Sequence, residues 1–238
     1  MIYHECGHIL YSDFDMLSLY MGTLSTGRFY PSEPDDLTLS LENALSEIKT
    51  AVAKDDDAVK NALCDISGQL VNIMEDVYIE NRMCDTYQGK VRYCILLNNM
   101  KFADTMDTVT EEIKKAHFDV AILINLLIQY AKCGDINNLD GYKGPLLDVV
   151  YDCIPYIDNA AYAEDARERF DAANHILLLL WPYMQTFIDD LRKNPDKAKE
   201  AMGEQVASAN GTSKGSGKQA RGMEKATPNP GGKRGNTK

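Results

Sequence analysis

Residues 58–86 read AVKNALCDISGQLVNIMEDVYIENRMCDT, and this stretch decides the fold. Its apolar side chains recur at steps of three and four residues, a spacing typical of a helix with one apolar side. These side chains are Leu63, Ile66, Leu70, Ile73 and Val77, and Met83 lies on the same apolar side six residues further on. Asp55, Asp56 and Asp57 come just before and favour a turn followed by a helix N-terminus. The stretch therefore predicts one long helix.

The rest of the chain is also predicted to be helical over most of its length. Similar spacing predicts helices at 1–24, 37–53, 90–102, 109–132, 146–157 and 162–193. Glycine and proline mark the loops between them, and Pro182 should kink the last helix. Phe170, Leu177, Met184 and Leu191 recur at steps of seven in that helix and predict a packing seam inside the molecule. The expected fold class is therefore mainly α.

The composition changes near residue 203. Residues 203–238 are rich in Gly, Ser, Lys, Pro and Asn, carry a net charge of +5, and lack the apolar side chains that a folded core needs. We therefore expect a helical domain at 1–202 and a disordered basic linker or tail at 203–238. The first 202 residues carry a net charge of −16, which argues against binding of nucleic acid.

The sequence also indicates a compartment. No apolar run reaches the roughly 18 residues that a membrane-spanning helix needs. The six cysteines form no C-x-x-C pair and stand in helical contexts, as expected of free thiols in a reducing environment. We therefore expect a cytoplasmic protein that does not enter a membrane.

The segment His4-Glu5-Cys6-Gly7-His8 is an H-E-x-x-H motif. Residues four apart share one face of a helix, so His4 and His8 are candidate ligands of a single zinc ion. Glu5 is the candidate general base, which takes a proton from a zinc-activated water. Gly7 should leave room for a close approach of the backbone beside the metal.

A third metal ligand is expected in the segment NIMEDVYIE, which runs from Asn72 to Glu80. Asp76 is the first candidate, and Glu75 is the alternative because its side chain reaches further. Asn72, Asp76 and Glu80 are spaced by four and lie along one stripe of the helix, so Glu80 could orient a histidine N–H. Asp13, just beyond the motif, is a further candidate for that supporting role.

The segments HECGHILYSDF and NIMEDVYIE together resemble the metallopeptidase region that precedes von Willebrand factor A-like domains in bacterial and phage-borne proteins. The resemblance covers about residues 2–15 and 70–83. It implies a zincin-like fold, a bound zinc ion, a peptide or protein substrate and a von Willebrand factor A-like module after the linker. This architecture is similar to that of a cobaltochelatase subunit, which implies an AAA-type ATPase as a partner.

The motif begins three residues after the start of the chain. We therefore expect a piece of a longer protein, without the sheet that precedes the motif helix in zincins and with uncertain activity by itself. The first functional hypothesis is a zinc metallopeptidase domain that hydrolyses peptide or amide bonds. The alternative is a non-catalytic metal-binding or scaffold domain that partners a von Willebrand factor A-like module in an ATPase- or chelatase-like assembly.

Overall fold

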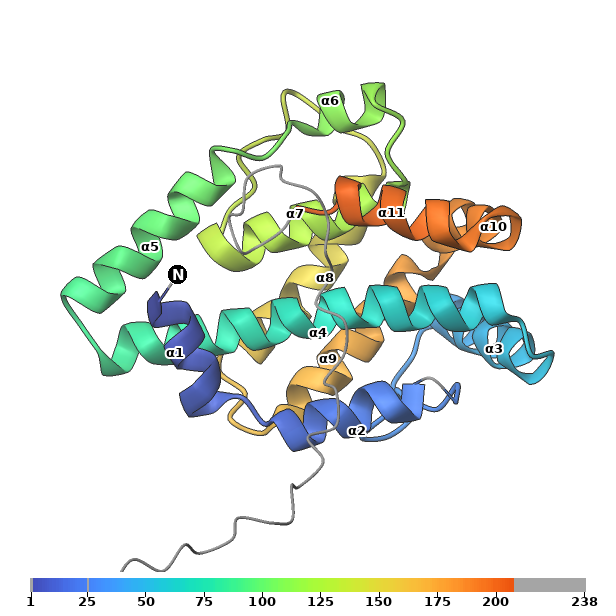
Figure 1. Cartoon of the computed structure of the whole chain (residues 1–238), viewed down its shortest axis with the longest axis horizontal. Coiled ribbons are helices and arrows are strands. Elements are labelled where there is room, and N and C mark those ends of the chain that lie inside the picture. The colour runs from blue at the N-terminus through green and yellow to red at the C-terminus, as the bar shows by residue number, and fades with distance from the viewer. Residues whose placement is uncertain (1, 25, 208–238) are drawn as a thin grey trace, which may run out of the picture.

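The structure, a computed structural model, describes residues 2–24 and 26–207. Helices form all the regular secondary structure in these two ranges, where no strand occurs (Figure 1). The predicted mainly α fold is therefore confirmed. The helices are α1 (Ile2–Tyr11), α2 (Phe14–Leu24), α3 (Leu39–Ala53), α4 (Asp57–Thr86), α5 (Lys90–Ala103), α6 (Val109–Lys114), α7 (Asp119–Cys133), α8 (Leu146–Ala160), α9 (Ala166–Leu180), the 3-10 helix η1 (Trp181–Met184), α10 (Gln185–Lys193) and α11 (Pro195–Gln205).

The long helix α4 runs through the middle of the bundle (Figure 1). The side chain of Asp56 accepts hydrogen bonds from the backbone N–H groups of Ala58 and Val59, and this cap begins the helix. Helices α1, α5, α7, α9 and α10 all contact α4. Because neighbours surround it, Val71 and Met74 are buried as fully as Leu70 on the predicted apolar side. The helix predicted at 58–86 is thus confirmed and forms the axis of the core.

Helices α7 and α9 complete the core around α4. Every residue from 120 to 129 of α7 is buried, as expected of a helix that is covered on all sides. The predicted seam of Phe170, Leu177, Met184 and Leu191 is buried along α9, η1 and α10. That seam packs inside the molecule, as the sequence indicated.

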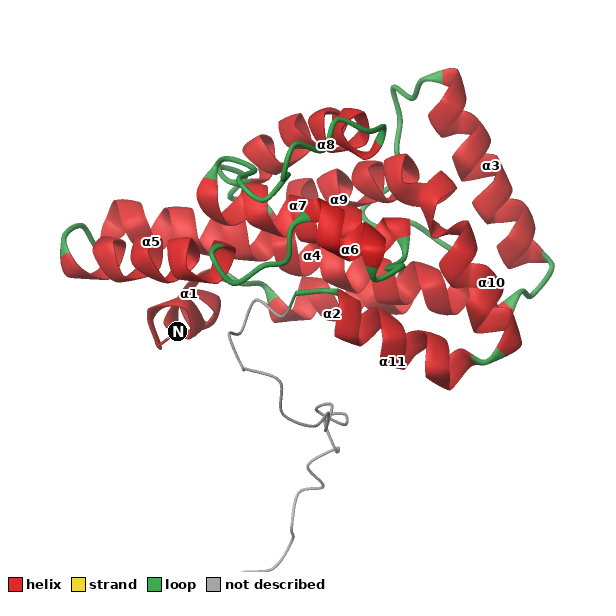
Figure 2. Ribbon diagram, turned by 90° about the horizontal axis from the view of Figure 1, so that it is seen from above, coloured by secondary structure: helices red, strands yellow, loops and turns green. Residues whose placement is uncertain are grey.

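Three of the predicted helices are interrupted. The side chain of Asp13 accepts a hydrogen bond from the N–H of Met16 (3.0 Å), so a new helix starts after α1. Ala116 has a positive φ of 55°, which ends α6 and separates it from α7. Pro182 has no N–H to donate, and η1 stands between α9 and α10 at this position. Figure 2 shows the loops that join the helices.

The helical domain extends past the predicted boundary at 202/203. The side chain of Asn194 accepts from the N–H of Lys197, and Pro195 opens α11, which continues to Gln205. Met202 and Val206 are buried in the core. Residues 203–207 therefore belong to the folded domain, and the rest of the predicted tail lies outside the described residues.

None of the described helices is both long and apolar enough to cross a bilayer.

Candidate metal centre

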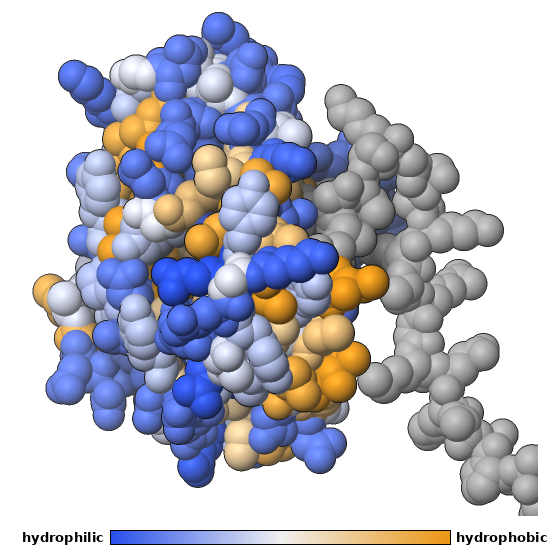
Figure 3. Space-filling view, turned by 90° about the vertical axis from the view of Figure 1, so that its left-hand side faces the viewer, coloured by the Kyte–Doolittle hydropathy of each residue, from blue (hydrophilic) through white to orange (hydrophobic). Residues whose placement is uncertain are grey.

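Helix α1 turns its histidines inward and its aliphatic residues outward. The side chains of His4 and His8 are 12% and 26% exposed, whereas Ile2 and Ile9 are both 76% exposed. A surface helix normally shows the reverse, because burial of aliphatic side chains stabilises the fold. Figure 3 views the end of the molecule that α1 and α5 form, and apolar surface is visible there. The orientation of α1 indicates a site built from its histidines.

Gly7 allows α1 to lie close to α4. A Cβ atom at this position would lie 3.2 Å from Cγ of Met83 and 3.3 Å from Cβ of Ile79, tighter than ordinary contacts. The sequence led us to expect a close approach beside the metal. The structure places that approach against α4, which brings the motif histidines to the carboxylates of α4.

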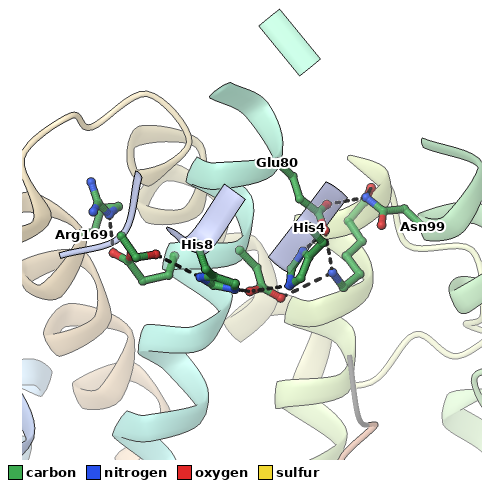
Figure 4. A network of polar contacts seen from close by, with 9 residues as sticks. His4, His8, Glu80, Asn99 and Arg169 are labelled. Atoms are coloured by element: carbon green, nitrogen blue, oxygen red, sulfur yellow. Dashed lines mark hydrogen bonds and ion pairs between the residues drawn. The ribbon is translucent and has the colours of Figure 1, made fainter. Parts of the chain in front are cut away.

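Three side chains converge at this contact (Figure 4). Oδ1 of Asp76 lies 3.2 Å from Nε2 of His8 and 3.5 Å from Nε2 of His4. The three candidate ligand atoms lie within 4.8 Å of one another. Tetrahedral zinc with bonds of about 2.0–2.1 Å separates its ligand atoms by roughly 3.3–3.4 Å. The two separations from Asp76 lie close to that spacing, and the histidine nitrogens lie no more than 4.8 Å apart, so the three side chains are candidate zinc ligands.

The other ring nitrogen of each histidine has its own partner. Nδ1 of His4 donates to Oε1 of Glu80 at 2.8 Å, and Oε2 of Glu80 accepts from Nδ2 of Asn99 at 2.6 Å. Nδ1 of His8 lies 3.0 Å from Oγ of Ser12. These contacts hold the rings so that Nε2 of each faces Asp76. The hydrogen bond that the sequence predicted between Glu80 and a histidine N–H is thus present.

Charges of both signs meet at the centre. Nζ of Lys132 lies 3.2 Å from Oε1 of Glu80 and 3.5 Å from Oδ2 of Asp76. Burial opposes ionisation of Glu80, but the hydrogen bond from His4, the charge of Lys132 and the hydrogen bond from Asn99 bring its pKa to about 2. Burial would lower the pKa of His4, but Glu80 and Asp76 outweigh that effect and raise it. Glu80 is therefore ionised across the physiological pH range.

The alternative ligand, Glu75, is not at the centre. Its Oε1 accepts a hydrogen bond from Nε of Arg169 at 2.6 Å, and both side chains are buried (Figure 4). Nη1 of Arg169 also donates to the carbonyl of Ala163 at 2.6 Å, and its guanidinium stacks on the ring of Tyr78 at 4.0 Å. Glu75 therefore serves a buried ion pair, and its assignment as a metal ligand is wrong.

Asn72 and Asp13 are the two remaining residues that the sequence predicted for the site, and the structure places them differently. Asn72 is exposed and lines the cavity beside the centre, on the same stripe as Asp76 and Glu80. Asp13 instead caps the start of α2 through Met16, so the supporting role predicted for it is wrong. Ser12 takes that place, and its spacing of four residues from His8 was a signal in the sequence.

The centre lies in the wall of a cavity of about 360 Å³. Glu5 is exposed and lines this cavity together with the three candidate ligands. The other lining residues are Gln69, Asn72, Ile73, Val77, Glu80, Ile128, Ala131, Lys132, Gly203, Val206 and Ala207. The motif glutamate and the converging ligands thus share one solvent-accessible space.

Lys132 and Asn99 were missed by the sequence analysis. Lys132 comes from the last turn of α7, and Asn99 comes from α5. Neither residue has a sequence spacing that relates it to the motif. Only the packing of α5 and α7 against α4 brings them to Glu80.

Comparisons of this chain with protein-family models, with curated proteins and with solved structures found no match. The resemblance to a metallopeptidase region therefore stays a prediction from the two motif segments. The fold and the site define an all-helical domain with a candidate centre of two histidines and one carboxylate.

Proposed function

We propose that this chain is a zinc-dependent peptidase domain that hydrolyses peptide or other amide bonds. The observation that carries the proposal is the convergence of His4 and His8 with Asp76, which lies about 70 residues downstream. An H-E-x-x-H pattern can occur by chance, but chance does not supply a third ligand at the right separation. The presence of Glu5 in the same cavity favours a catalytic metal over a purely structural one.

The proposed ligands are Nε2 of His4, Nε2 of His8 and Oδ1 of Asp76. Two imidazoles and one carboxylate are a donor set that zinc prefers in catalytic sites, where a fourth position stays open. Zinc held in this way lowers the pKa of a bound water towards neutrality. Glu80 and Ser12 keep the rings oriented through the opposite nitrogens.

Glu5 is the proposed general base. It is exposed, it lines the cavity, and it follows the ligand His4 directly in the chain. Its carboxylate accepts a proton from the attacking water and delivers it to the leaving nitrogen of the substrate. The exposure of Glu5 suits a group that must exchange its proton with the substrate.

The second candidate is a scaffold domain, in which this network is structural and a von Willebrand factor A-like module and an ATPase are the partners. The ion pairs of Lys132 with Asp76 and Glu80 favour this alternative, because they join α4 to α7 within the protein itself. A structural network predicts that loss of a histidine lowers stability and that no hydrolysis depends on Glu5.

The test combines zinc content with hydrolysis. We expect about one zinc ion per purified chain by elemental analysis, and cleavage of fluorescein-labelled casein. Glu5→Gln should retain the zinc and lose activity by about 10²-fold or more, the range for loss of a general base. His4→Ala should lose the zinc. Glu42→Gln, on the exposed face of α3, is the matched control and should behave as the wild type. Full activity of zinc-loaded Glu5→Gln would contradict the proposal.

A further inference from the structure

Lys132 places a positive charge in the wall of the candidate metal cavity. Its side chain is 5% exposed, and its Nζ lies 3.2 Å from Oε1 of Glu80 and 3.5 Å from Oδ2 of Asp76. Among the cavity-lining residues in the described part of the chain, it is the only lysine or arginine. The proposed function so far gives this cation no role.

The position of Lys132 is unfavourable for metal binding. An ammonium beside a ligand carboxylate repels a second cation and competes for the charge of Asp76. Glu80 also accepts hydrogen bonds from His4 and Asn99, so Lys132 is one of three partners that stabilise its charge. A lysine that serves only to neutralise these acids would therefore weaken the metal site without a compensating benefit there.

The hydrogen-bonding capacity of Lys132 is not used up by the two acids. An ammonium carries three N–H donors. Among the described residues Asp76 and Glu80 accept hydrogen bonds from it, and its Nζ also lies 5.9 Å from the centre of the Phe102 ring. Lys132 also lines the cavity, so a molecule bound there would lie beside its side chain. The two ion pairs hold Nζ in place, as a preorganised electrostatic group requires.

We infer that Lys132 is a further catalytic residue, whose ammonium stabilises the negative charge that develops on the carbonyl oxygen of the scissile amide. This inference rests on the proposed peptidase function. Three acids, Glu5, Asp76 and Glu80, share the cavity with it and disfavour a substrate carboxylate in the ground state. The lysine therefore suits a charge that appears only during the reaction.

The step balances with the groups already assigned. The water oxygen attacks the carbonyl carbon while Glu5 accepts a water proton, and the π electrons of the carbonyl move to its oxygen beside Lys132. The carbonyl then re-forms, the C–N bond breaks, and the leaving nitrogen receives the proton from Glu5. One amide and one water give one carboxylic acid and one amine, and the charge of Lys132 does not change.

The experiment separates metal binding from catalysis. Lys132→Met and Lys132→Gln are compared with the wild type, because glutamine keeps a donor to the carboxylates without the charge. The matched control is Lys199→Met, which removes a lysine paired with Asn61 and Asp65 outside the cavity. Zinc affinity is measured by competition with a chromogenic chelator. The values of kcat and KM are measured on the best-cleaved member of a library of internally quenched peptides, and circular dichroism verifies the fold.

We expect both Lys132 variants to bind zinc at least as tightly as the wild type, because a repelling charge is gone. Their kcat should fall by about 10²-fold, the usual effect of removing one group that stabilises an oxyanion, with KM changed less than about threefold. Lys199→Met should keep the wild-type zinc affinity and kcat.

Three results would overturn the inference: an unchanged kcat at full zinc loading, a loss confined to KM, or a loss of zinc from Lys132→Gln with its fold intact. If Lys132→Met fails to fold, Lys132→Gln alone decides the outcome. If the wild type cleaves the peptide, Glu5→Gln does not and Lys132→Gln still does, the role of Lys132 alone is refuted. A zinc-loaded wild type that cleaves no amide refutes the peptidase proposal and this inference together.

Discussion

Replacement of Arg169 by methionine should destabilise the domain severely. Arg169 is 1% exposed, and its Nε bonds to Oε1 of Glu75 at 2.6 Å. Its removal leaves the carboxylate of Glu75 buried without its partner, which costs about 3–5 kcal/mol. A typical domain has only about 5–15 kcal/mol of stability in total. The substitution should therefore remove a large part of the free energy of unfolding.

The effect can be measured by thermal and urea unfolding. For a domain of this size, 1 kcal/mol shifts the melting temperature by about 2–4 °C, so the expected fall is roughly 6–20 °C. Arg167→Met is the matched control on the same helix, because Arg167 is exposed and, among the described residues, pairs with the half-buried Asp165. This control should cost less than about 1 kcal/mol.

A double variant tests the stated cause. Glu75→Gln removes the stranded charge, so the pair Arg169→Met and Glu75→Gln should cost less than the sum of the two single changes by about 1–3 kcal/mol. If Arg169→Met destabilises no more than Arg167→Met, or if the two changes are simply additive, the ion pair does not stabilise the fold as argued.

The remaining predictions concern the helix contact, pH and the metal. Gly7→Ala should cost about 1–3 kcal/mol in urea unfolding because its Cβ crowds α4, whereas Gly68→Ala, whose Cβ would meet only Met21 at 3.7 Å, should stabilise by about 0.5–1 kcal/mol. Burial raises the pKa of Glu112 from 4.5 to about 7, so the folded state holds this proton more tightly and the free energy of unfolding falls as the pH rises through that window. The wild type should lose at most about 3 kcal/mol of unfolding free energy between pH 5 and pH 8. Glu112→Gln should abolish this pH-dependent loss when urea unfolding is measured at both pH values. Glu80→Gln should weaken zinc binding by about 10–100-fold in chelator competition, and equal affinity would contradict its orienting role.

Much of the site follows local rules that a sequence displays. His4 and His8 share a helix face through their spacing of four, and the same rule placed Asp76 and Glu80 on one stripe of α4. The expected contact between Glu80 and a histidine N–H is present at 2.8 Å. Lys132 escaped prediction because it reaches the site from a separate helix, at a distance along the chain that no helical period encodes.

The break between α1 and α2 also shows what residue spacing does not predict. Asp13 carried a carboxylate near the motif, and this suggested a role beside the histidines. Its short side chain bonds the nearby N–H of Met16 instead, because a local backbone donor is close without any folding of the chain. A residue that can satisfy itself locally is a poor candidate for a distant contact.

The sequence by itself determined the helical class, the long central helix and the donor pairs that lie four residues apart, because these depend on backbone geometry within a few turns. Only the tertiary structure decided between Glu75 and Asp76. The two neighbours point about 100° apart on α4, and the spacing alone does not show which direction faces α1. Arg169 on α9 pairs with one carboxylate, and the close approach of α1 at Gly7 leaves the other to the histidines.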